Sequence, residues 1–379
     1  MPAHSGITSF YRHLATQMRP ATVPLLNPRL VAHGTGGRSS VSGVVATVFG
    51  STGFLGRYVV NRLGRMGSTV FVAWRGDELD YRHLKPMGDL GQINPVEVEA
   101  RNMHSLQRAV AGSNVVINLI GKWFDTRYYT LEDVHVNVAE SIARAAAAEN
   151  VPHLIHVSAL GVHNTSPHAL ANRWLQSKRR GEEAVRRAFP AATIMRPADV
   201  FGPEDRFLTR IADMLQHWPF YPLIKQGAAR VQPVWVDDVA RAITASVRDP
   251  ELTAGRTYEL AGPSTLTRRQ VVEFVIDATK RENHLVSVPT AAARLAAKVF
   301  GRRLPFVNPS PRYTPCDVLR EAVDVVMQAP AAQTVTRAPE VLGFAHLDVR
   351  PYELTTQVGH NTLRQYRRGG DRSALFHVD

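Results

Sequence analysis

The sequence has little cysteine and no long apolar run. Cys316 is the one cysteine in 379 residues, which excludes an intramolecular disulfide and any site with several thiolate ligands, such as an iron–sulfur cluster. We expect this thiol to be a small buried or partly buried side chain. No run of 18 or more apolar residues occurs, so no segment is long enough to cross a bilayer as a helix.

Acidic residues are missing from the first part of the chain, where no carboxylate precedes Asp77. The first 43 residues contain four arginines, three histidines and many serines and threonines, a composition typical of a signal for import into an organelle. We therefore predict that residues 1–43 form a basic N-terminal extension that acts as a transit segment. An ordinary basic N-terminus is the alternative.

Patterns for metal and nucleic-acid binding are also absent. Fifteen histidines occur without the HExxH spacing of a zinc site, so we assign no metal. The net charge of +12 comes without a basic stripe interleaved with aromatic residues, which argues against nucleic acid as a partner. An acidic protein or anionic lipid is therefore the remaining candidate partner for the basic surface. Residues 291–303 predict a basic amphipathic helix that either docks on its own lobe or faces such a partner.

Strands and helices alternate from residue 44. Six short apolar runs have the length of strands buried on both faces; they are residues 44–49, 69–74, 94–100, 114–121, 153–159 and 192–198. Segments with helical spacing separate most of them, at residues 54–67, 104–112, 131–150 and 171–189. This order predicts an α/β fold, a Rossmann-type doubly wound parallel sheet with right-handed crossovers.

The regular alternation ends near residue 200, after which prolines become more frequent. We predict a dinucleotide-binding Rossmann domain over residues 44–200 and a smaller, irregular C-terminal lobe with a basic tail over residues 201–379. Residues 230–262 read as strand, helix and strand, and we expect them to return to the Rossmann core. Asp237 and Asp238 are the predicted N-capping pair of that helix.

A glycine-rich turn directly follows the first predicted strand. Three glycines at GxxGxxG spacing stand between this strand and a helix, the context in which they allow a tight turn and close approach of backbone to a pyrophosphate. The helix N-terminus attracts the same anion. The residues of the turn that we predict to bind a cofactor are Gly50, Ser51, Thr52, Gly53, Phe54, Leu55, Gly56 and Arg57.

The residue after the second strand bears on the choice of cofactor. An NAD site normally carries an acid about 20 residues after the turn, where it binds the ribose diol. Arg75 stands there, 19 residues after Gly56. Because a guanidinium suits the 2′-phosphate of NADP(H), NADPH is the predicted cofactor and NAD the less favoured one. The alternative is an NAD site in which Asp77 binds the ribose.

These motifs together resemble an atypical or extended short-chain dehydrogenase/reductase. More narrowly, the segments GSTGFLGRYVVNRLGRMGS, SNVVINLIGKWFDT, EDVHVN and RPADVFGPEDRF resemble the reductase-like accessory subunits of mitochondrial respiratory complex I, NADH:ubiquinone oxidoreductase. The resemblance is close over residues 34–262 and looser elsewhere. It implies a mitochondrial protein on the matrix side of the inner membrane, whose partners are other complex I subunits of the peripheral arm near the quinone-binding region.

The resemblance also implies further site residues. In working members of the superfamily a tyrosine transfers the proton, and a lysine four positions later lowers the tyrosine's pKa and holds the nicotinamide ribose. Lys178 keeps the lysine position, although an exposed helix lysine is the alternative, and Trp174 replaces the tyrosine. The cofactor contacts that complete our prediction are Leu119, Ile120, Gly121, Val157, Ser158, Lys178 and Pro197.

The loss of the tyrosine bears on catalysis. An indole N–H donates a hydrogen bond but exchanges no proton as a phenol does, and a missing general acid costs about 10²- to 10⁴-fold in rate. We therefore predict no catalytic residue and NADPH held as a structural cofactor that supports assembly and stability. One alternative is a free organellar NADP-dependent reductase, with Tyr128 or Tyr129 entering the pocket; another is a binding module that senses the NADP pool.

Overall fold

The computed structural model describes residue 37 and residues 39–300, 313–327 and 342–367. Most of the predicted transit segment lies outside the described residues. So do the last residues of the predicted basic helix and the end of the C-terminal tail.

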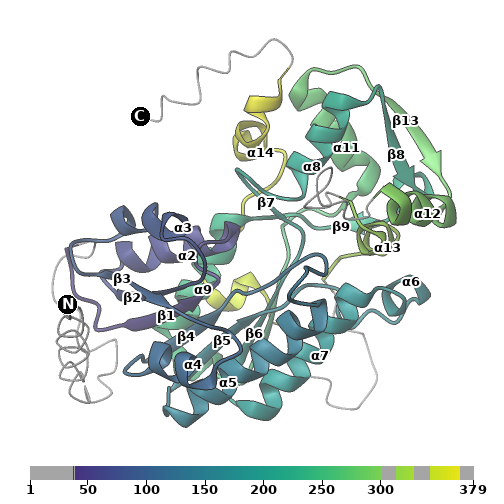
Figure 1. The fold of residues 1–379 in the computed structure, drawn as a ribbon. Coiled ribbons are helices and arrows are strands. Elements are labelled where there is room, and N and C mark those ends of the chain that lie inside the picture. Colours follow the sequence, from purple (N-terminus) through teal and green to yellow (C-terminus); the bar gives the residue numbers. More distant parts are fainter. Residues whose placement is uncertain (1–36, 38, 301–312, 328–341, 368–379) are drawn as a thin grey trace, which may run out of the picture.

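A seven-stranded sheet forms the larger lobe (Figure 1). Its order is β11-β6-β5-β4-β1-β2-β3, and every neighbouring pair is parallel. The strands are β1 (Val45–Phe49), β2 (Thr69–Trp74), β3 (Ile93–Glu97), β4 (Val115–Asn118), β5 (His153–Val157), β6 (Thr193–Pro197) and β11 (Thr257–Leu260). The predicted doubly wound α/β fold is thereby confirmed, and the strand order reverses between β1 and β4, where such sheets bind their ligands.

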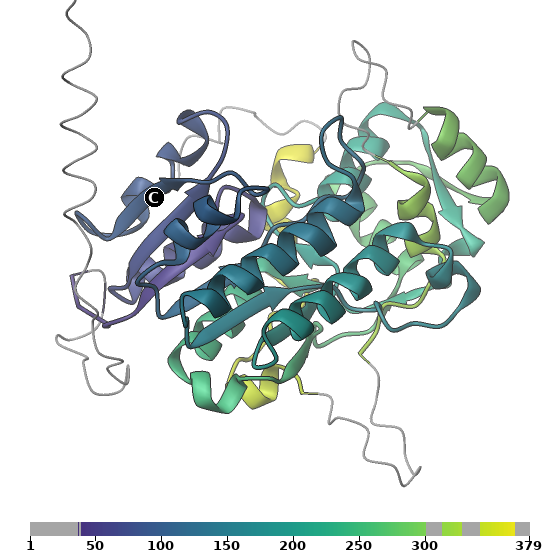
Figure 2. The ribbon, with the colours of Figure 1, turned by 60° about the horizontal axis from the view of Figure 1, so that its bottom comes forward.

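Helices cover both faces of this sheet. The helices α2 (Phe54–Arg65) and α9 (Val236–Arg248) pack together on one face. Figure 2 shows the other face, covered by α4 (Met103–Val110), α5 (Val138–Ala148) and α7 (Arg173–Ala188) side by side. Along β4, Val115 and Ile117 join one hydrophobic cluster and Val116 joins the other, because successive side chains of a strand point to opposite faces. Burial on both faces explains the continuous apolar runs of the sequence.

A π-helical turn, Asp133–Asn137, precedes α5 and replaces the start of the single long helix that the sequence predicts at residues 131–150. It passes very close to α7. A Cβ atom on Gly181 of α7 would lie 2.1 Å from the carbonyl oxygen of His135, so only glycine allows this approach. The contact brings the His135 side chain towards the start of α7.

The smaller lobe has only short strands and its own helices. Three strand pairs are β7 (Val200–Phe201) with β10 (Val234–Trp235), β8 (Phe220–Ile224) with β13 (His284–Val288), and β9 (Arg230–Val231) with β12 (Leu266–Thr267). Its main helices are α8 (Leu208–His217), α11 (Arg268–Thr279), α12 (Thr290–Phe300), α13 (Pro315–Glu321) and α14 (Gln357–Thr362). Shorter helices are α3 (Leu79–Arg82) and α6 (Pro167–Leu170) in the larger lobe and α10 (Pro250–Thr253) after α9.

The predicted capping of α9 is wrong. Trp235 is the N-cap residue, so Asp237 and Asp238 lie within the first turn, where carboxylates still interact favourably with the positive end of the helix. Their side chains serve other contacts. Asp237 pairs with Arg62 of α2, and the buried carboxylate of Asp238 accepts a 2.6 Å hydrogen bond from the backbone N–H of Tyr352. Asp237 thereby holds together the two helices on one face of the sheet.

Two other predictions concern the cysteine and membrane-spanning helices. Cys316, at the start of α13, is partly buried as predicted, and burial raises the pKa of its thiol. None of the helices in the described residues is both long and apolar enough to cross a membrane.

Candidate functional site

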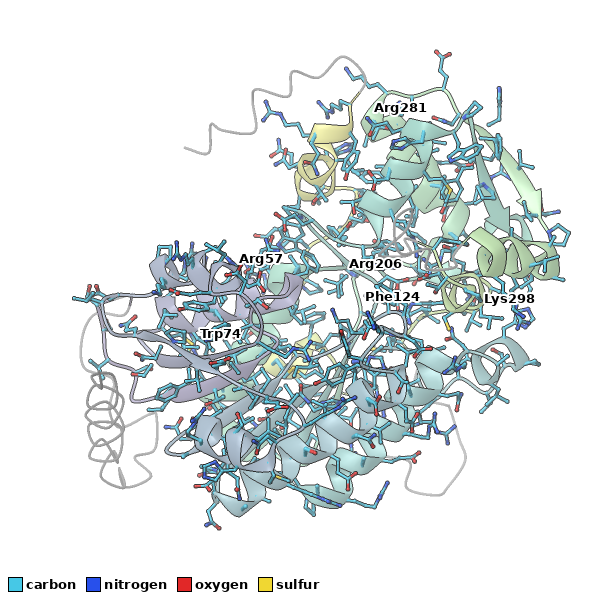
Figure 3. The ribbon with its side chains drawn as sticks, in the orientation of Figure 1. Arg57, Trp74, Phe124, Arg206, Arg281 and Lys298 are labelled. Atoms are coloured by element: carbon cyan, nitrogen blue, oxygen red, sulfur yellow. The ribbon has the colours of Figure 1, made fainter. Side chains whose placement is uncertain are left out.

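A cleft of about 520 Å³ lies at the carboxyl ends of the central strands, between the sheet and the smaller lobe. Ten of the sixteen predicted cofactor-binding residues line it: Gly50, Gly53, Phe54, Leu55, Gly56, Leu119, Gly121, Ser158, Lys178 and Pro197. They come from five separate segments of the chain, and the sheet brings them together. In Figure 3, Arg57, Arg206 and Phe124 lie around the junction between the two lobes, where the cleft is.

The other six predicted residues do not line the cleft. Four of them make local contacts: the Ser51 hydroxyl donates to the Ala73 carbonyl, the Ile120 N–H donates to the Asn118 side chain, the Val157 carbonyl accepts from Lys178, and Arg57 pairs with Glu204 at 2.5 Å. Thr52 is half-buried in the turn, and Arg75 lies beside the ring of Tyr129.

The turn between β1 and α2 needs glycine at two positions. Gly50 has a φ of +77°, and a Cβ atom there would lie 3.0 Å from the backbone nitrogen of Ile120. A Cβ atom on Gly56 would lie 2.4 Å from the carbonyl oxygens of both Gly50 and Ser51. Gly53 is the N-cap of α2 and offers no side chain to its first N–H groups. These groups are therefore available to an anion in the cleft.

Lys178 is buried at the inner wall of the cleft, with 7% of its surface exposed. The alternative of an exposed helix lysine is therefore wrong. Its Nζ donates a 3.2 Å hydrogen bond to the carbonyl of Val157, and a Cβ atom on Gly121 would lie 3.4 Å from the same Nζ. Burial lowers the pKa of Lys178 to about 8. The side chain is thus a cation at neutral pH with little competition from water.

His135 supports this wall; it lies in the EDVHVN segment that carried the family resemblance, but the sequence assigned it no role. Burial lowers its pKa to about 2, so the ring is neutral. Its Nε2 accepts a 3.1 Å hydrogen bond from the backbone N–H of Lys122, which places the proton on Nδ1, 2.8 Å from the Ser177 hydroxyl. That hydroxyl donates in turn to the Trp174 carbonyl. This chain of bonds holds the loop after β4 against α7.

Trp174 occupies the position of the missing tyrosine and forms part of the cleft wall. Its ring stacks on Trp123, with centroids 4.4 Å apart and planes at 7°. Its indole N–H donates a 2.9 Å hydrogen bond to the carbonyl of Lys122. The only polar hydrogen of the side chain is therefore already engaged.

Neither Tyr128 nor Tyr129, the two tyrosines considered as replacements, lines the cleft. Tyr128 is 69% exposed, and Tyr129 packs against the hydrophobic core on one face of the sheet. No tyrosine belongs to the part of the cleft wall that the described residues form. The site as described therefore lacks a phenol beside Lys178.

Buried ion pairs form the wall on the side of the smaller lobe. Asp199 accepts hydrogen bonds from Arg268 at 2.7 Å and from Arg320 at 2.8 Å. Burial raises the pKa of Asp199, but the two guanidinium charges outweigh this effect and lower the pKa to about 2. Arg210 makes a similar pair of contacts with Asp317 and Glu321, at 2.8 and 3.0 Å. On this side of the cleft, these arginines and carboxylates form ion pairs with one another.

Sequence reasoning missed most of this wall. Arg268 and Arg320 lie far from Asp199 in the chain, and no short motif contains all three. Trp123 and Asp199 do lie inside segments that carried the family resemblance. Their place in these segments was a sequence signal for both residues, but it assigned a role to neither. No cluster of histidine, cysteine and acidic residues suited to a metal ion occurs within the described ranges.

Comparisons with known proteins agree with this geometry. Residues 46–261 match the model of the NAD dependent epimerase/dehydratase family. The chain is 42% identical over 348 residues to "NADH dehydrogenase [ubiquinone] 1 alpha subcomplex subunit 9, mitochondrial" of Arabidopsis thaliana, covering 90% of this chain and 82% of that protein. The Mus musculus protein of the same name is 45% identical over 277 residues, covering 73% and 72%.

The fold of the chain also resembles those of solved structures. The structure of a triphenylmethane reductase from Citrobacter sp. superposes with a TM-score of 0.61 at 16% identity, covering 85% of this chain and 99% of that one. At this low identity the likeness concerns the fold alone.

Proposed function

Because the chain belongs to the NAD dependent epimerase/dehydratase family, and within it to the relatives named subunit 9 of the NADH dehydrogenase [ubiquinone] 1 alpha subcomplex, we propose that it is an accessory subunit of mitochondrial complex I. In this proposal the subunit holds NADPH as a structural cofactor and carries out no turnover. It supports assembly and stability on the matrix side of the inner membrane, near the quinone-binding region.

The position of Trp174 is the observation that carries the proposal. In working reductases, one turn of the helix that corresponds to α7 supplies both the cation that holds the cofactor and the phenol that transfers the proton. Here Lys178 is buried at the cleft, while the indole of Trp174 is stacked on Trp123 and bonded to a backbone carbonyl. Binding and proton transfer are thereby separated, and only binding is supported.

The cofactor end of the cleft fits a dinucleotide. Gly50 and Gly56 leave the backbone free of side chains where the pyrophosphate approaches, and the first N–H groups of α2 have no side-chain cap. In this proposal Lys178 holds the nicotinamide ribose. A bound nicotinamide ring would supply a hydride, and no tyrosine lines the described part of the cleft to supply the accompanying proton. A ligand at 100 times its Kd stabilises the folded form by about 2.7 kcal/mol, without turnover.

The surroundings of Arg75 favour NADPH over NAD. The carboxylate of Asp77, the competing ribose ligand, accepts a 3.0 Å hydrogen bond from the backbone N–H of Leu79 and so serves the start of α3. Arg75 has no carboxylate partner in the part of the chain that the structure describes. Its guanidinium is available to a phosphate group.

The smaller lobe offers a surface for partners. Ala293 and Ala297 of α12 are buried against Val318, so this helix docks on its own lobe through one narrow face. Arg294, Leu295 and Lys298 point outward, and Leu295 is 65% exposed. An apolar side chain flanked by two cations suits a peripheral contact with anionic lipid or with an acidic neighbouring subunit.

Native co-migration tests the proposal. The tagged chain, expressed in mitochondria, is expected to travel with complex I on native gels and to release NADPH when the purified complex is denatured. Migration apart from the complex would refute the subunit assignment, and release of NAD alone would refute the cofactor assignment.

A free NADP-dependent reductase is the second candidate, and one observation favours it. The pKa of Lys178, about 8, allows this amine to exchange a proton near neutral pH. Steady oxidation of NADPH by the purified chain with a carbonyl substrate, abolished by Lys178→Ala, would establish the reductase and refute the structural role. We expect no such oxidation.

A further inference from the structure

Two arginines meet at one aromatic ring beside the glycine turn. The guanidinium carbon of Arg75 lies 4.8 Å from the centroid of the Tyr129 ring, and that of Arg101 lies 4.3 Å from the same centroid. Arg75 follows β2 directly, and Arg101 follows β3 after a short loop. Tyr129 comes from the loop after β4 and is partly buried against the core beneath the sheet. Three separate loops therefore converge at this edge.

The sheet explains the convergence. The strands β1, β2 and β3 are parallel neighbours, and Trp74 at the end of β2 is in register with Glu97 at the end of β3. The loops that follow these strands leave at the same edge, and the glycine turn follows β1 at that edge as well. In a Rossmann fold the adenosine half of a dinucleotide lies along this edge, above the end of β2.

Arg101 is held in place more firmly than an ordinary surface arginine. Its Nη2 donates a 2.6 Å hydrogen bond to the carbonyl of Tyr128, while its guanidinium lies over the Tyr129 ring. The Asp133 carboxylate lies 3.9 Å away, at the outer limit of an ion pair. With one nitrogen engaged, the remaining N–H groups of the fork are left for a ligand.

Arg57 is less suited to the same task. It follows the last glycine of the turn, but its guanidinium is paired at 2.5 Å with Glu204, on the loop between β7 and α8. A phosphate group would have to displace that carboxylate. The pair of arginines at Tyr129 presents no carboxylate as close as this in the described residues.

We propose that Arg101 acts with Arg75 as a two-arginine site for the 2′-phosphate of NADPH, with the Tyr129 ring as the support of both guanidinium groups. A phosphate monoester carries a charge of about −1.5 to −2 near neutral pH, which two cations match better than one. The two guanidinium carbons are at most 9.1 Å apart, the sum of their distances to the ring centroid. A phosphate that binds both guanidinium groups requires the two side chains to turn towards it, and it then accepts charge-assisted bonds about 2.8 Å long.

The inference rests on the proposed function and names residues that decide cofactor choice. Its test compares NADPH and NADH binding to the purified full chain by calorimetry. Arg101→Gln is expected to weaken NADPH binding roughly tenfold, the loss of one charge-assisted contact, and to leave NADH binding within about twofold. Arg75→Gln is expected to act in the same way. Added salt should weaken NADPH binding less in Arg101→Gln than in the wild type.

Arg144→Gln is the matched control. Arg144 has a similar exposure, 64% against 56% for Arg101, and pairs with Glu140, but it does not contact Tyr129. Its removal should leave both affinities unchanged. Tyr129→Leu should reduce the preference for NADPH, whereas Tyr129→Phe should retain it, because the ring and not the hydroxyl supports the arginines.

The outcomes separate this inference from the function on which it rests. A wild-type chain that binds neither cofactor, or that binds NADH as tightly as NADPH, would refute the proposed cofactor. A wild-type preference for NADPH that Arg75→Gln reduces and Arg101→Gln leaves intact would overturn only the two-arginine site. The same holds if Arg144→Gln is as damaging as Arg101→Gln.

Discussion

The two ends of the cleft are built in opposite ways. At the cofactor end Gly50, Gly53 and Gly56 expose backbone beside the apolar residues Phe54 and Leu55, and Lys178 supplies one buried cation. At the end formed by the smaller lobe the wall consists of charged side chains, which pair with one another. The first end offers backbone N–H groups and one cation to a ligand. At the second end, in contrast, the carboxylate of Asp199 is already bound by two arginines, of which Arg268 Nε and Arg320 Nη1 are buried without a hydrogen-bond partner in the described residues.

Under the proposed function, this difference is what would let a reductase fold keep its cofactor and lose its reaction. Binding depends on the turn after β1 and on the start of α2, which are complete. Proton transfer depends on the region between the ends, where Trp174 and Trp123 stack and leave no phenol. Beyond them, Asp199, which follows β6, pairs with Arg268 and Arg320 of the smaller lobe, so that end of the cleft helps to hold the two lobes together.

The largest expected effect lies at the charged end. Asp199→Asn leaves Arg268 and Arg320 buried without a carboxylate, which should lower the free energy of unfolding by about 3–5 kcal/mol, measured by denaturant titration. The pKa of Asp199 is lowered to about 2, so its contribution is present above its unfolded value of 3.8 and is lost as the pH falls towards 2.

Asp324→Asn is the control for this variant. Asp324 also pairs with an arginine, Arg230, but both side chains are largely exposed, at 42% and 60%. Its loss should cost at most about 1 kcal/mol. Equal losses in the two variants would show that burial does not set the strength of the Asp199 network.

The next effect lies at the cofactor end. Gly56→Ala places a Cβ atom 2.4 Å from two carbonyl oxygens and should displace the turn, which should weaken NADPH binding about 100-fold in a fluorescence titration. Gly53→Ala meets only one oxygen, at 3.2 Å, and should cost much less. If the two variants bind NADPH equally well, the close approach at Gly56 does not shape the site.

A third, smaller effect is a pH dependence that originates in Lys178. NADPH affinity should fall about tenfold as the pH rises from 7 to 9.5, because the ammonium with its pKa of about 8 loses its charge. Lys178→Met should abolish this dependence. The stability of the cofactor-free protein should change in the opposite direction: the pKa is lowered from 10.5, so stability rises between about pH 8 and 10.5. An unchanged pH profile in Lys178→Met would contradict the assignment.

The smallest expected effect is that of Trp174→Tyr. This change restores the phenol but also removes the stack on Trp123 and the hydrogen bond to the Lys122 carbonyl. NADPH should remain bound, and little or no oxidation with carbonyl substrates should appear, since the arginines and carboxylates of the charged end already pair with one another. Substantial turnover would show that the tyrosine alone separates this protein from an enzyme.

The sequence also predicted more of the cofactor end of the cleft than of the charged end. The glycine turn could be read because its residues are contiguous and their role is a backbone property, visible in the order of strand, glycines and helix. Lys178 and Trp174 followed from the resemblance to reductases, in which a tyrosine and a lysine stand four positions apart on one helix. The role of His135 could not be predicted, because it depends on the close contact of Gly181 with the π-helical turn.

Four features could be read from short segments of the chain: the α/β class, the strands of the sheet, the glycine turn and the tryptophan at the position of the expected tyrosine. Strands show themselves by burial on both faces, and the other features by residue type in a local motif. The packing of distant segments, in contrast, buries Lys178, brings Arg268 and Arg320 to Asp199, and joins Arg101 to Arg75 at Tyr129. These contacts join residues that are far apart in the chain, and local periodicity carries no information about which distant side chains the sheet brings together.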